Sequence, residues 1–192
     1  VEALVSAAET DLGRIDLFVA NAGIATGLGL DASDDDWDRA LGINVLAHVR
    51  AARAVVPRWL ADGEGGRFLV TASAAGMLSM VGDAPYSVTK HGAVAFAEWL
   101  SLTYRDKGVV VQALCPQGVR TAMIEGVGPV EALLRPGSLS TDEVADAVWA
   151  ALQTGSFYVL PHPEVAGMYA ARAQDPDAWL ASMNRLQAKL GL

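Results

Sequence analysis

Cysteine and histidine are scarce in this chain, and their scarcity limits its chemistry. Cys115 is the only cysteine among 192 residues, so no disulfide can form within the chain, and a reducing, cytoplasmic location is expected. The histidines lie far apart in the sequence, without carboxylates or the cysteine at ligand spacing; they are His48, His91 and His162. We therefore expect no metal site.

Long apolar runs are also lacking. The best candidate for a membrane span, residues 93–102, is short and is interrupted by Glu98. Basic residues are outnumbered, because 14 lysines and arginines face 22 aspartates and glutamates, which gives a formal net charge of −8. A chain this acidic is expected to bind neither nucleic acid nor an anionic membrane, and a small neutral substrate is a better match.

What the sequence does contain is a regular alternation of strand and helix patterns. Apolar runs predict buried strands at residues 15–20, 67–71, 109–114 and 157–160. Helices are predicted at about residues 1–12, 33–60, 85–107 and 141–153, with a further helix at the C-terminus. Such alternation is typical of an α/β fold with a parallel sheet and flanking helices. We expect residues 1–192 to form one domain.

Ser73, Tyr86 and Lys90 form a candidate proton-transfer group. Asp83 is expected to cap a helix with Pro85 in its first turn, which would place Tyr86 near the positive end of the helix dipole and Lys90 one turn further on the same face. Both effects favour the phenolate. Lowering a tyrosine pKa from about 10 to about 7 takes roughly 4 kcal/mol, and one ammonium at about 4 Å in an effective dielectric of about 20 supplies that amount.

A phenol, an ammonium and a hydroxyl in this spacing suit carbonyl and alcohol redox chemistry. The serine would hold the substrate oxygen while the tyrosine gives or takes its proton and a hydride moves at carbon. A tyrosine and a lysine four residues apart on a helix are more often surface residues, so the functional interpretation depends on the neighbouring motifs.

Those motifs lie on both sides of the group. Asn21-Ala22-Gly23 follows the first predicted strand, and Asn44 lies inside the predicted helix 33–60, where asparagine costs helix propensity. The strand 109–114 runs into Cys115-Pro116-Gln117-Gly118-Val119-Arg120-Thr121. With these motifs in this order, the chain resembles the short-chain dehydrogenase/reductase family, from about residue 1 to about residue 121 and more loosely beyond.

The resemblance implies a Rossmann-like fold and an oxidoreductase that transfers a hydride between NAD or NADP and an alcohol or ketone. By this resemblance Tyr86 is the general acid/base, Ser73 holds the substrate, and Asn44 holds a water in the proton relay. Lys90 also bonds the nicotinamide ribose. Besides Tyr86 and Lys90, the cofactor-binding residues that it implies are Asn21, Ala22 and Gly23 beside the adenine pocket, and Pro116, Gly118, Val119 and Thr121 around the nicotinamide.

The family opens with a strand, a glycine-rich turn and a helix that hold the cofactor pyrophosphate, and no such opening is visible here. Residues 1–12 read as an amphipathic helix, so the first βαβ units are expected to be absent, together with the residue that distinguishes NAD from NADP. Cofactor binding by this chain alone is therefore expected to be weak.

One loop could replace the missing turn. Residues 23–29 have glycine spacing like a phosphate loop, but the next helix begins only after Ser33, and the acidic run 34–36 would repel a phosphate. We expect a plain loop, and a cofactor-binding loop is the alternative.

Residues 119–138 are expected to form a lid over the substrate. The lid would end at the turn 135–138, before the helix 141–153. Its apolar residues favour a small, largely apolar substrate; they are Met123, Ile124, Val127 and Leu133.

The predicted helices 33–60 and 85–107 are expected to form a homo-oligomer interface, as they do in the family that the chain resembles. Small residues on them suit close packing; they are Ala47, Ala51, Ala54, Gly92, Ala93, Ala95 and Ala97. The strand 15–20 is apolar on both faces yet lacks a neighbour on one side. We expect either a longer enzyme of which this is the C-terminal part, or a second copy that covers the edge. The alternative function is a non-catalytic fragment that keeps the interface without effective cofactor binding.

Overall fold

A computed structural model describes residues 1–124 and 129–192. Their sheet is parallel throughout, and its strands are β1 (Leu17–Ala20), β2 (Gly66–Thr71), β3 (Val109–Leu114) and β4 (Tyr158–Val159), in that spatial order. Phe18 lies opposite Phe68, and Phe68 lies opposite Val111. The predicted α/β fold, with a parallel sheet flanked by helices, is confirmed.

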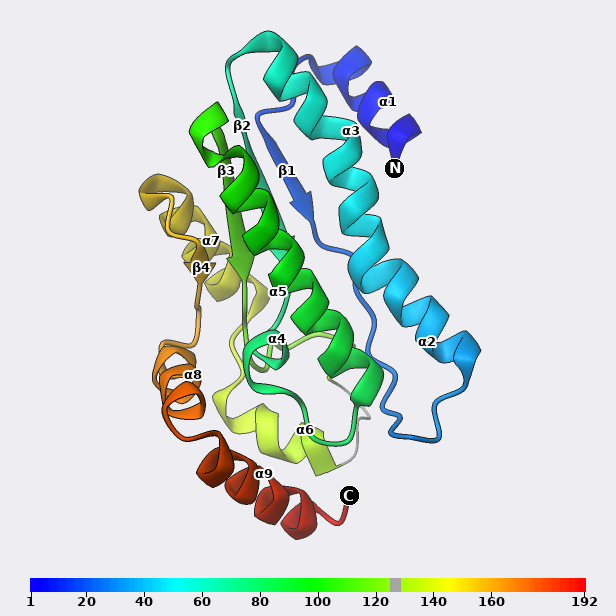
Figure 1. Cartoon of the computed structure of the whole chain (residues 1–192), viewed down its shortest axis with the longest axis vertical. Coiled ribbons are helices and arrows are strands. Elements are labelled where there is room, and N and C mark those ends of the chain that lie inside the picture. The colour runs from blue at the N-terminus through cyan, green and yellow to red at the C-terminus, as the bar shows by residue number, and fades with distance from the viewer. Residues whose placement is uncertain (125–128) are drawn as a thin grey trace.

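Helices lie on both faces of this sheet (Figure 1). α3 (Ala47–Asp62) and α5 (Ala84–Tyr104) cross one face, and α7 (Thr141–Thr154) packs on the other. The described residues also form α1 (Glu2–Leu12), α2 (Asp34–Leu41), α4 (Ala75–Leu78), α6 (Pro129–Leu134), α8 (Glu164–Gln174) and α9 (Pro176–Leu190), with 3₁₀ turns at Arg105–Lys107 and Arg135–Gly137. Within the described ranges, no helix has the length and apolar character needed to cross a membrane.

Side chains that alternate along β2 and β3 build two cores. Phe68, Val70 and Val111 are buried against the helices of one face. Leu69 and Leu114 point the opposite way and pack with α7. Apolar side chains on both faces are what a central parallel strand requires. Packing on both sides therefore fixes the carboxyl ends of these strands, where the loops with the candidate residues begin.

β1 lies at the edge of the described sheet. Leu17 and Val19 face the same side as Leu69 and are 37% and 44% exposed. The core under α7 is formed by Leu69 and by residues of β3 and β4, and it does not extend over these two side chains. Apolar surface on β1 thus remains open to solvent, and the cover expected for this strand stays a prediction.

Two predicted helices differ from those observed. The helix expected at 33–60 is interrupted by a π-helical segment, Gly42–Leu46, between α2 and α3. The expected C-terminal helix is divided into α8 and α9, because Pro176 cannot continue the hydrogen bonding of α8 and Asp175 caps α9 instead. Neither α4 nor α6 is predicted by the sequence pattern.

The small residues expected at an oligomer interface are largely used inside the chain. Ala51, Ala54, Ala93 and Ala97 are at most 2% exposed, because they pack in the core of the chain itself. The large apolar side chains that α5 exposes are Val88, Trp99 and Leu102. The four alanines are therefore used inside the chain, whereas Ala95 is exposed, and the oligomer interface stays a prediction.

Candidate active site

Asp83 fixes the start of α5 and with it the position of Tyr86. Its carboxylate accepts a hydrogen bond from the Tyr86 backbone N–H at 2.9 Å, as an N-cap does. Pro85 occupies the first turn, as expected. Tyr86 and Lys90 follow one turn apart, and both are buried, at 8% and 2% exposed.

Ser73, Tyr86 and Lys90 meet at the carboxyl end of β2. Ser73 lies just beyond the strand, and its side chain is close enough to the Tyr86 phenol to lower the pKa of that phenol. Lys90 Nζ lies 5.5 Å from the centre of the Tyr86 ring and donates to the Thr71 carbonyl at 2.9 Å. Because Thr71 is the last residue of β2, the end of one strand positions both the ammonium and the serine loop.

The pKa of Tyr86 is raised, contrary to the expectation from Lys90. Burial is the largest cause, and the Ser73 hydrogen bond, which lowers the pKa, only partly opposes it. The Coulombic effects of Asp83 and Cys115 add to the rise. Lys90 directs its ammonium to a backbone carbonyl instead of the phenol oxygen. In this chain the phenol is therefore protonated at neutral pH.

Burial also lowers the pKa values of two basic side chains, Lys90 and His48. Burial lowers the pKa of Lys90 to about 8. His48 of α3 is 1% exposed, and burial, followed by the charge of Lys90, lowers the pKa of His48 to about 4. Neither ring nitrogen of His48 has a hydrogen-bond partner among the described residues. His48 is thus a neutral imidazole buried in the field of Lys90.

Asn44 lies in the π-helical segment and is fully buried. Its amide group donates to the Ile24 carbonyl and to the Thr89 hydroxyl, both at 2.9 Å, and its Oδ1 accepts from the Ile24 N–H at 2.8 Å. Asn44 therefore ties the segment after β1 to α5. π-helical segments are frequent at functional sites, and the water-holding role of Asn44 stays a prediction.

The segment Asn21–Gly23 follows β1 and lies against the same group. Asn21 Oδ1 accepts from the Thr71 hydroxyl at 3.0 Å. A Cβ on the glycine of this segment would lie 3.0 Å from Lys90 Nζ and 3.4 Å from Asn44 Oδ1. The backbone here approaches the polar group so closely that any side chain would press on it.

The loop 23–29 already binds carboxylates of the chain itself. The backbone N–H groups of Thr26 and Gly27 donate to Asp83 at 2.8 and 2.7 Å, and the Thr26 hydroxyl adds a third bond at 2.8 Å. The Gly29 N–H donates to Asp31 at 2.9 Å. Donors that a phosphate loop would direct at an anion are thus occupied, which favours the predicted plain loop over the cofactor-loop alternative.

Pro116 connects the loop after β3 to the serine. Its carbonyl accepts from the Ala74 N–H at 2.8 Å, and the Ser73 hydroxyl lies 3.5 Å from the same oxygen. Residues predicted to bind cofactor therefore contact the residue predicted to hold substrate. All these loops leave the carboxyl ends of parallel strands, where α/β folds place their ligands.

Gly118, Val119 and Thr121 lead from this turn toward the predicted lid. The Leu139 N–H donates to the Gly118 carbonyl at 3.1 Å, and Val119 forms an isolated bridge with Leu139. Thr121 donates its hydroxyl hydrogen to the Val119 carbonyl at 3.3 Å. Of the apolar residues expected in the lid, Met123 and Leu133 are 41% and 43% exposed, Ile124 is half-buried, and Val127 lies outside the described residues.

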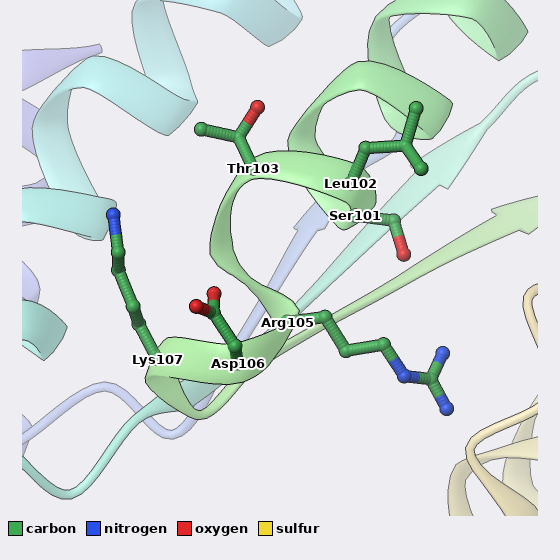
Figure 2. Close-up of a pocket in the computed structure, with 6 residues that line it drawn as sticks. All are labelled: Ser101, Leu102, Thr103, Arg105, Asp106 and Lys107. Carbon is green, nitrogen blue, oxygen red and sulfur yellow. The ribbon is translucent and has the colours of Figure 1, made fainter.

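A surface hollow of about 660 Å³ lies at the other end of α5 (Figure 2). Its lining residues are Ser101, Leu102, Thr103, Arg105, Asp106 and Lys107. Figure 2 shows Arg105 and Lys107 pointing to opposite sides, so the two cations do not converge on one ligand. The hollow contains none of the predicted site residues and is not the candidate active site.

His162, one of three histidines scattered along the sequence, is not among the residues that the sequence predicts for this site. The residue lies just beyond β4, is 4% exposed and accepts a hydrogen bond from the Gln117 N–H at 3.1 Å. A polar residue directly after a predicted parallel strand is a signal that could have identified it, because such residues gather at the ligand-binding edge of the sheet.

Comparisons with known proteins agree with this geometry. Residues 1–131 match the short chain dehydrogenase family. The chain is 34% identical over 182 residues to the 1-deoxy-11-beta-hydroxypentalenate dehydrogenase of Streptomyces exfoliatus, and the match covers 93% of the chain and 66% of that relative. The chain thus spans just under two thirds of the length of this relative.

Solved structures are similar over nearly the whole chain. A short chain dehydrogenase/reductase from Burkholderia phymatum in complex with NAD has a TM-score of 0.82 at 27% identity, covering 92% of this chain and 72% of its own. A short-chain dehydrogenase from Sphingobium yanoikuyae in complex with NADPH has a TM-score of 0.76 at 26% identity, covering 94% and 70%. The match includes the Rossmann-like arrangement of sheet and helices described above.

Proposed function

The chain belongs to the short-chain dehydrogenase family, and we propose that it carries the catalytic part of an oxidoreductase that transfers a hydride between NAD(P) and a small, largely apolar alcohol or ketone. The observation that carries this proposal is the buried group of Ser73, Tyr86 and Lys90, in which a hydroxyl, a phenol and an ammonium meet at one strand end. The name of the Streptomyces relative, a dehydrogenase of a hydroxylated compound, supports the same reaction class.

Tyr86 is the proposed proton donor when a ketone is reduced. Burial keeps its phenol protonated, so the proton is available when negative charge develops on the carbonyl oxygen. Ser73 acts on the phenol and would hold the same substrate oxygen, which would place that oxygen between the two hydroxyls. Lys90 would stabilise the phenolate left behind. For alcohol oxidation the same residues act in reverse, and a raised Tyr86 pKa makes that direction favoured by higher pH.

The residues present fit the nicotinamide half of NAD(P), which supplies or accepts the hydride. The Gly23 backbone approaches Lys90 so closely that a Cβ would lie 3.0 Å from Nζ, and the glycine therefore leaves the ammonium unobstructed. Asn21, Ala22 and Gly23 would line one side of the cofactor, and Pro116, Gly118, Val119 and Thr121 the other, with Tyr86 and Lys90 between them. The loop 23–29 does not fit the pyrophosphate, because its N–H donors are taken by Asp83.

The surroundings of the group support the proposed substrate and assembly. The predicted lid, residues 119–138, carries the apolar side chains Met123 and Leu133, which would favour an apolar substrate. α5 exposes Trp99 and Leu102, and we propose that α2, α3 and α5 contribute to a homo-oligomer.

A second candidate is a non-catalytic fragment that keeps the oligomer surface without effective cofactor binding. It is favoured by the occupied donors of the loop 23–29. The two candidates differ in their response to cofactor, because a ligand that binds only the folded chain raises its stability by mass action.

Thermal unfolding with NADH and with NADPH, up to millimolar concentrations, tests the choice. The proposed oxidoreductase predicts a saturable rise in unfolding temperature with at least one cofactor and ketone-dependent oxidation of that cofactor. NADH-free and ketone-free samples are the controls. No rise and no oxidation with either cofactor, across a panel of alkyl and aryl ketones, would support the non-catalytic fragment and overturn the proposal.

A further inference from the structure

His162 holds two separate segments through its two ring nitrogens. Nδ1 accepts from the Gln117 backbone N–H, and Nε2 lies 3.1 Å from the Gly137 carbonyl. An amide N–H can only donate and a carbonyl can only accept, so Nδ1 must carry the lone pair and Nε2 the proton. The geometry therefore requires a neutral imidazole in a single tautomer.

The peptide group between Pro116 and Gln117 is held at both of its ends. Its carbonyl, from Pro116, accepts from the Ala74 N–H at 2.8 Å. Its N–H, from Gln117, donates to His162 at 3.1 Å. Rotation of this peptide plane would break both bonds, and the carbonyl end lies 3.5 Å from the Ser73 hydroxyl. The orientation of one peptide thus links the imidazole to the serine loop.

The second partner of His162 belongs to a segment that packs on the same turn. Gly137 precedes Ser138, and a Cβ on Gly118 would lie only 2.5 Å from Ser138 Oγ. The Arg120 N–H donates to the Leu139 carbonyl at 2.8 Å. His162 is therefore placed where the proposed cofactor turn and the end of the predicted lid come together.

We propose that His162 is a positioning residue that fixes the Pro116–Gln117 peptide, and through it the turn that faces the nicotinamide and the loop of Ser73. The part that concerns the cofactor rests on the proposed function. The imidazole bonds neither Ser73 nor Tyr86 directly, so its effect passes through the peptide plane. If His162 only filled space, the order of the turn would not depend on which of the two ring-nitrogen hydrogen bonds a substitution retains.

Two substitutions separate the two nitrogens of the ring. In His162→Asn the side-chain oxygen can take the place of Nδ1, which keeps an acceptor for Gln117 and loses the bond to Gly137. In His162→Gln the amide nitrogen can reach the place of Nε2, which keeps the donor to Gly137 and loses the acceptor. Each variant loses one hydrogen bond, so each serves as the stability control for the other.

Amide hydrogen exchange of the 192-residue chain, read by NMR at Gln117, is the primary test. We expect exchange at Gln117 to be about fivefold to tenfold faster in His162→Gln than in the wild type and nearly unchanged in His162→Asn, with similar unfolding temperatures for both variants. The ring nitrogens of the wild type should show the Nε2–H tautomer. Equal exchange at Gln117 in both variants, or an Nδ1–H tautomer, would overturn the proposal.

Cofactor affinity provides the second measurement. The dissociation constant for the cofactor that stabilises the wild type should rise several-fold in His162→Gln and remain near the wild-type value in His162→Asn. Equal affinities of the two variants would overturn the link to the cofactor turn. A wild-type chain that binds neither NADH nor NADPH would instead refute the proposed function, and the exchange at Gln117 would still decide whether His162 holds the peptide.

Discussion

Asp83 joins the loop 23–29 to the start of α5, and replacing it should destabilise the chain more than the loss of an ordinary helix cap. Its carboxylate accepts from the backbone N–H groups of Tyr86, Thr26 and Gly27 and from the Thr26 hydroxyl, at 2.7 to 2.9 Å. The residue as a whole is only 5% exposed. Water is therefore poorly placed to replace these bonds after Asp83→Ala.

The expected loss follows from the separate bonds. Removal of an aspartate N-cap costs about 1 kcal/mol, and each of the two loop N–H groups left without a partner costs about 1 kcal/mol more. We therefore expect Asp83→Ala to lower the free energy of unfolding by about 3 kcal/mol. Asp83→Ser can keep the cap and lose the loop bonds, and it should cost about 2 kcal/mol.

Urea unfolding with an unchanged slope is the assay, and Asp175→Ala is the matched control. Asp175 caps α9 by accepting from the Ala178 N–H at 2.9 Å, and its side chain has no hydrogen bond to a distant loop among the described residues. Its replacement should cost about 1 kcal/mol. Equal losses for Asp83→Ala and Asp175→Ala would refute the view that Asp83 also fixes the loop.

Three further predictions concern buried groups. Lys90→Met should raise the free energy of unfolding at pH 7 by about 2 kcal/mol, because the lowering of the Lys90 pKa from 10.5 to about 8 costs the wild type about 3 kcal/mol and the lost hydrogen bond to the Thr71 carbonyl offsets about 1 kcal/mol. The stability difference between the variant and the wild type should shrink as the pH rises from 8 to 10.5, and denaturation curves in which the difference stays constant would contradict this. The free energy of unfolding of His48→Leu should rise by about 3 kcal/mol relative to that of the wild type as the pH falls from 6.5 to 4, because the unfolded imidazole takes up a proton at a higher pH than the folded one. A stability difference that does not change over this pH range would count against this. Gly118→Ala should lower the free energy of unfolding by about 1 to 3 kcal/mol, since its Cβ would lie 2.5 Å from Ser138 Oγ and 2.9 Å from the Leu134 carbonyl oxygen. Gly137→Ala, whose Cβ would meet no atom of the described residues within 4 Å, is the control for calorimetry, and equal unfolding temperatures of the two variants would contradict the prediction.

Much of the fold could be predicted because its signals are local. Ser33 caps α2 by reciprocal hydrogen bonds with Asp36, and Asp83 caps α5 as expected. The strand at 109–114 is observed with the predicted bounds, since a short apolar run between two turns strongly favours a buried strand. The π-helical segment at Gly42–Leu46 could not be predicted, because a change of hydrogen-bond register leaves no clear mark on the side-chain pattern.

The positions of the candidate residues were easier to predict than their electrostatics. Ser73, Tyr86 and Lys90 lie near one another, as their spacing predicts, with Lys90 Nζ 5.5 Å from the centre of the Tyr86 ring, and their catalytic roles stay predictions. The direction of the Tyr86 pKa shift depended on burial and on where Lys90 Nζ points, which are properties of the folded chain. The role of His162 depends on the backbone of residues 117 and 137, which a sequence pattern does not bring together.

The central claim is that Tyr86 transfers the proton while a hydride moves. Deuterium transfer from a reduced cofactor labelled at the hydride position to a ketone measures the hydride step. Its rate in the wild type and in Tyr86→Phe shows how far that step depends on the phenol proton. Tyr86→Phe keeps the ring and loses the proton, so we expect the transfer rate at saturating cofactor to fall by roughly 10²–10⁴-fold. Transfer at the same rate in both proteins would contradict the account.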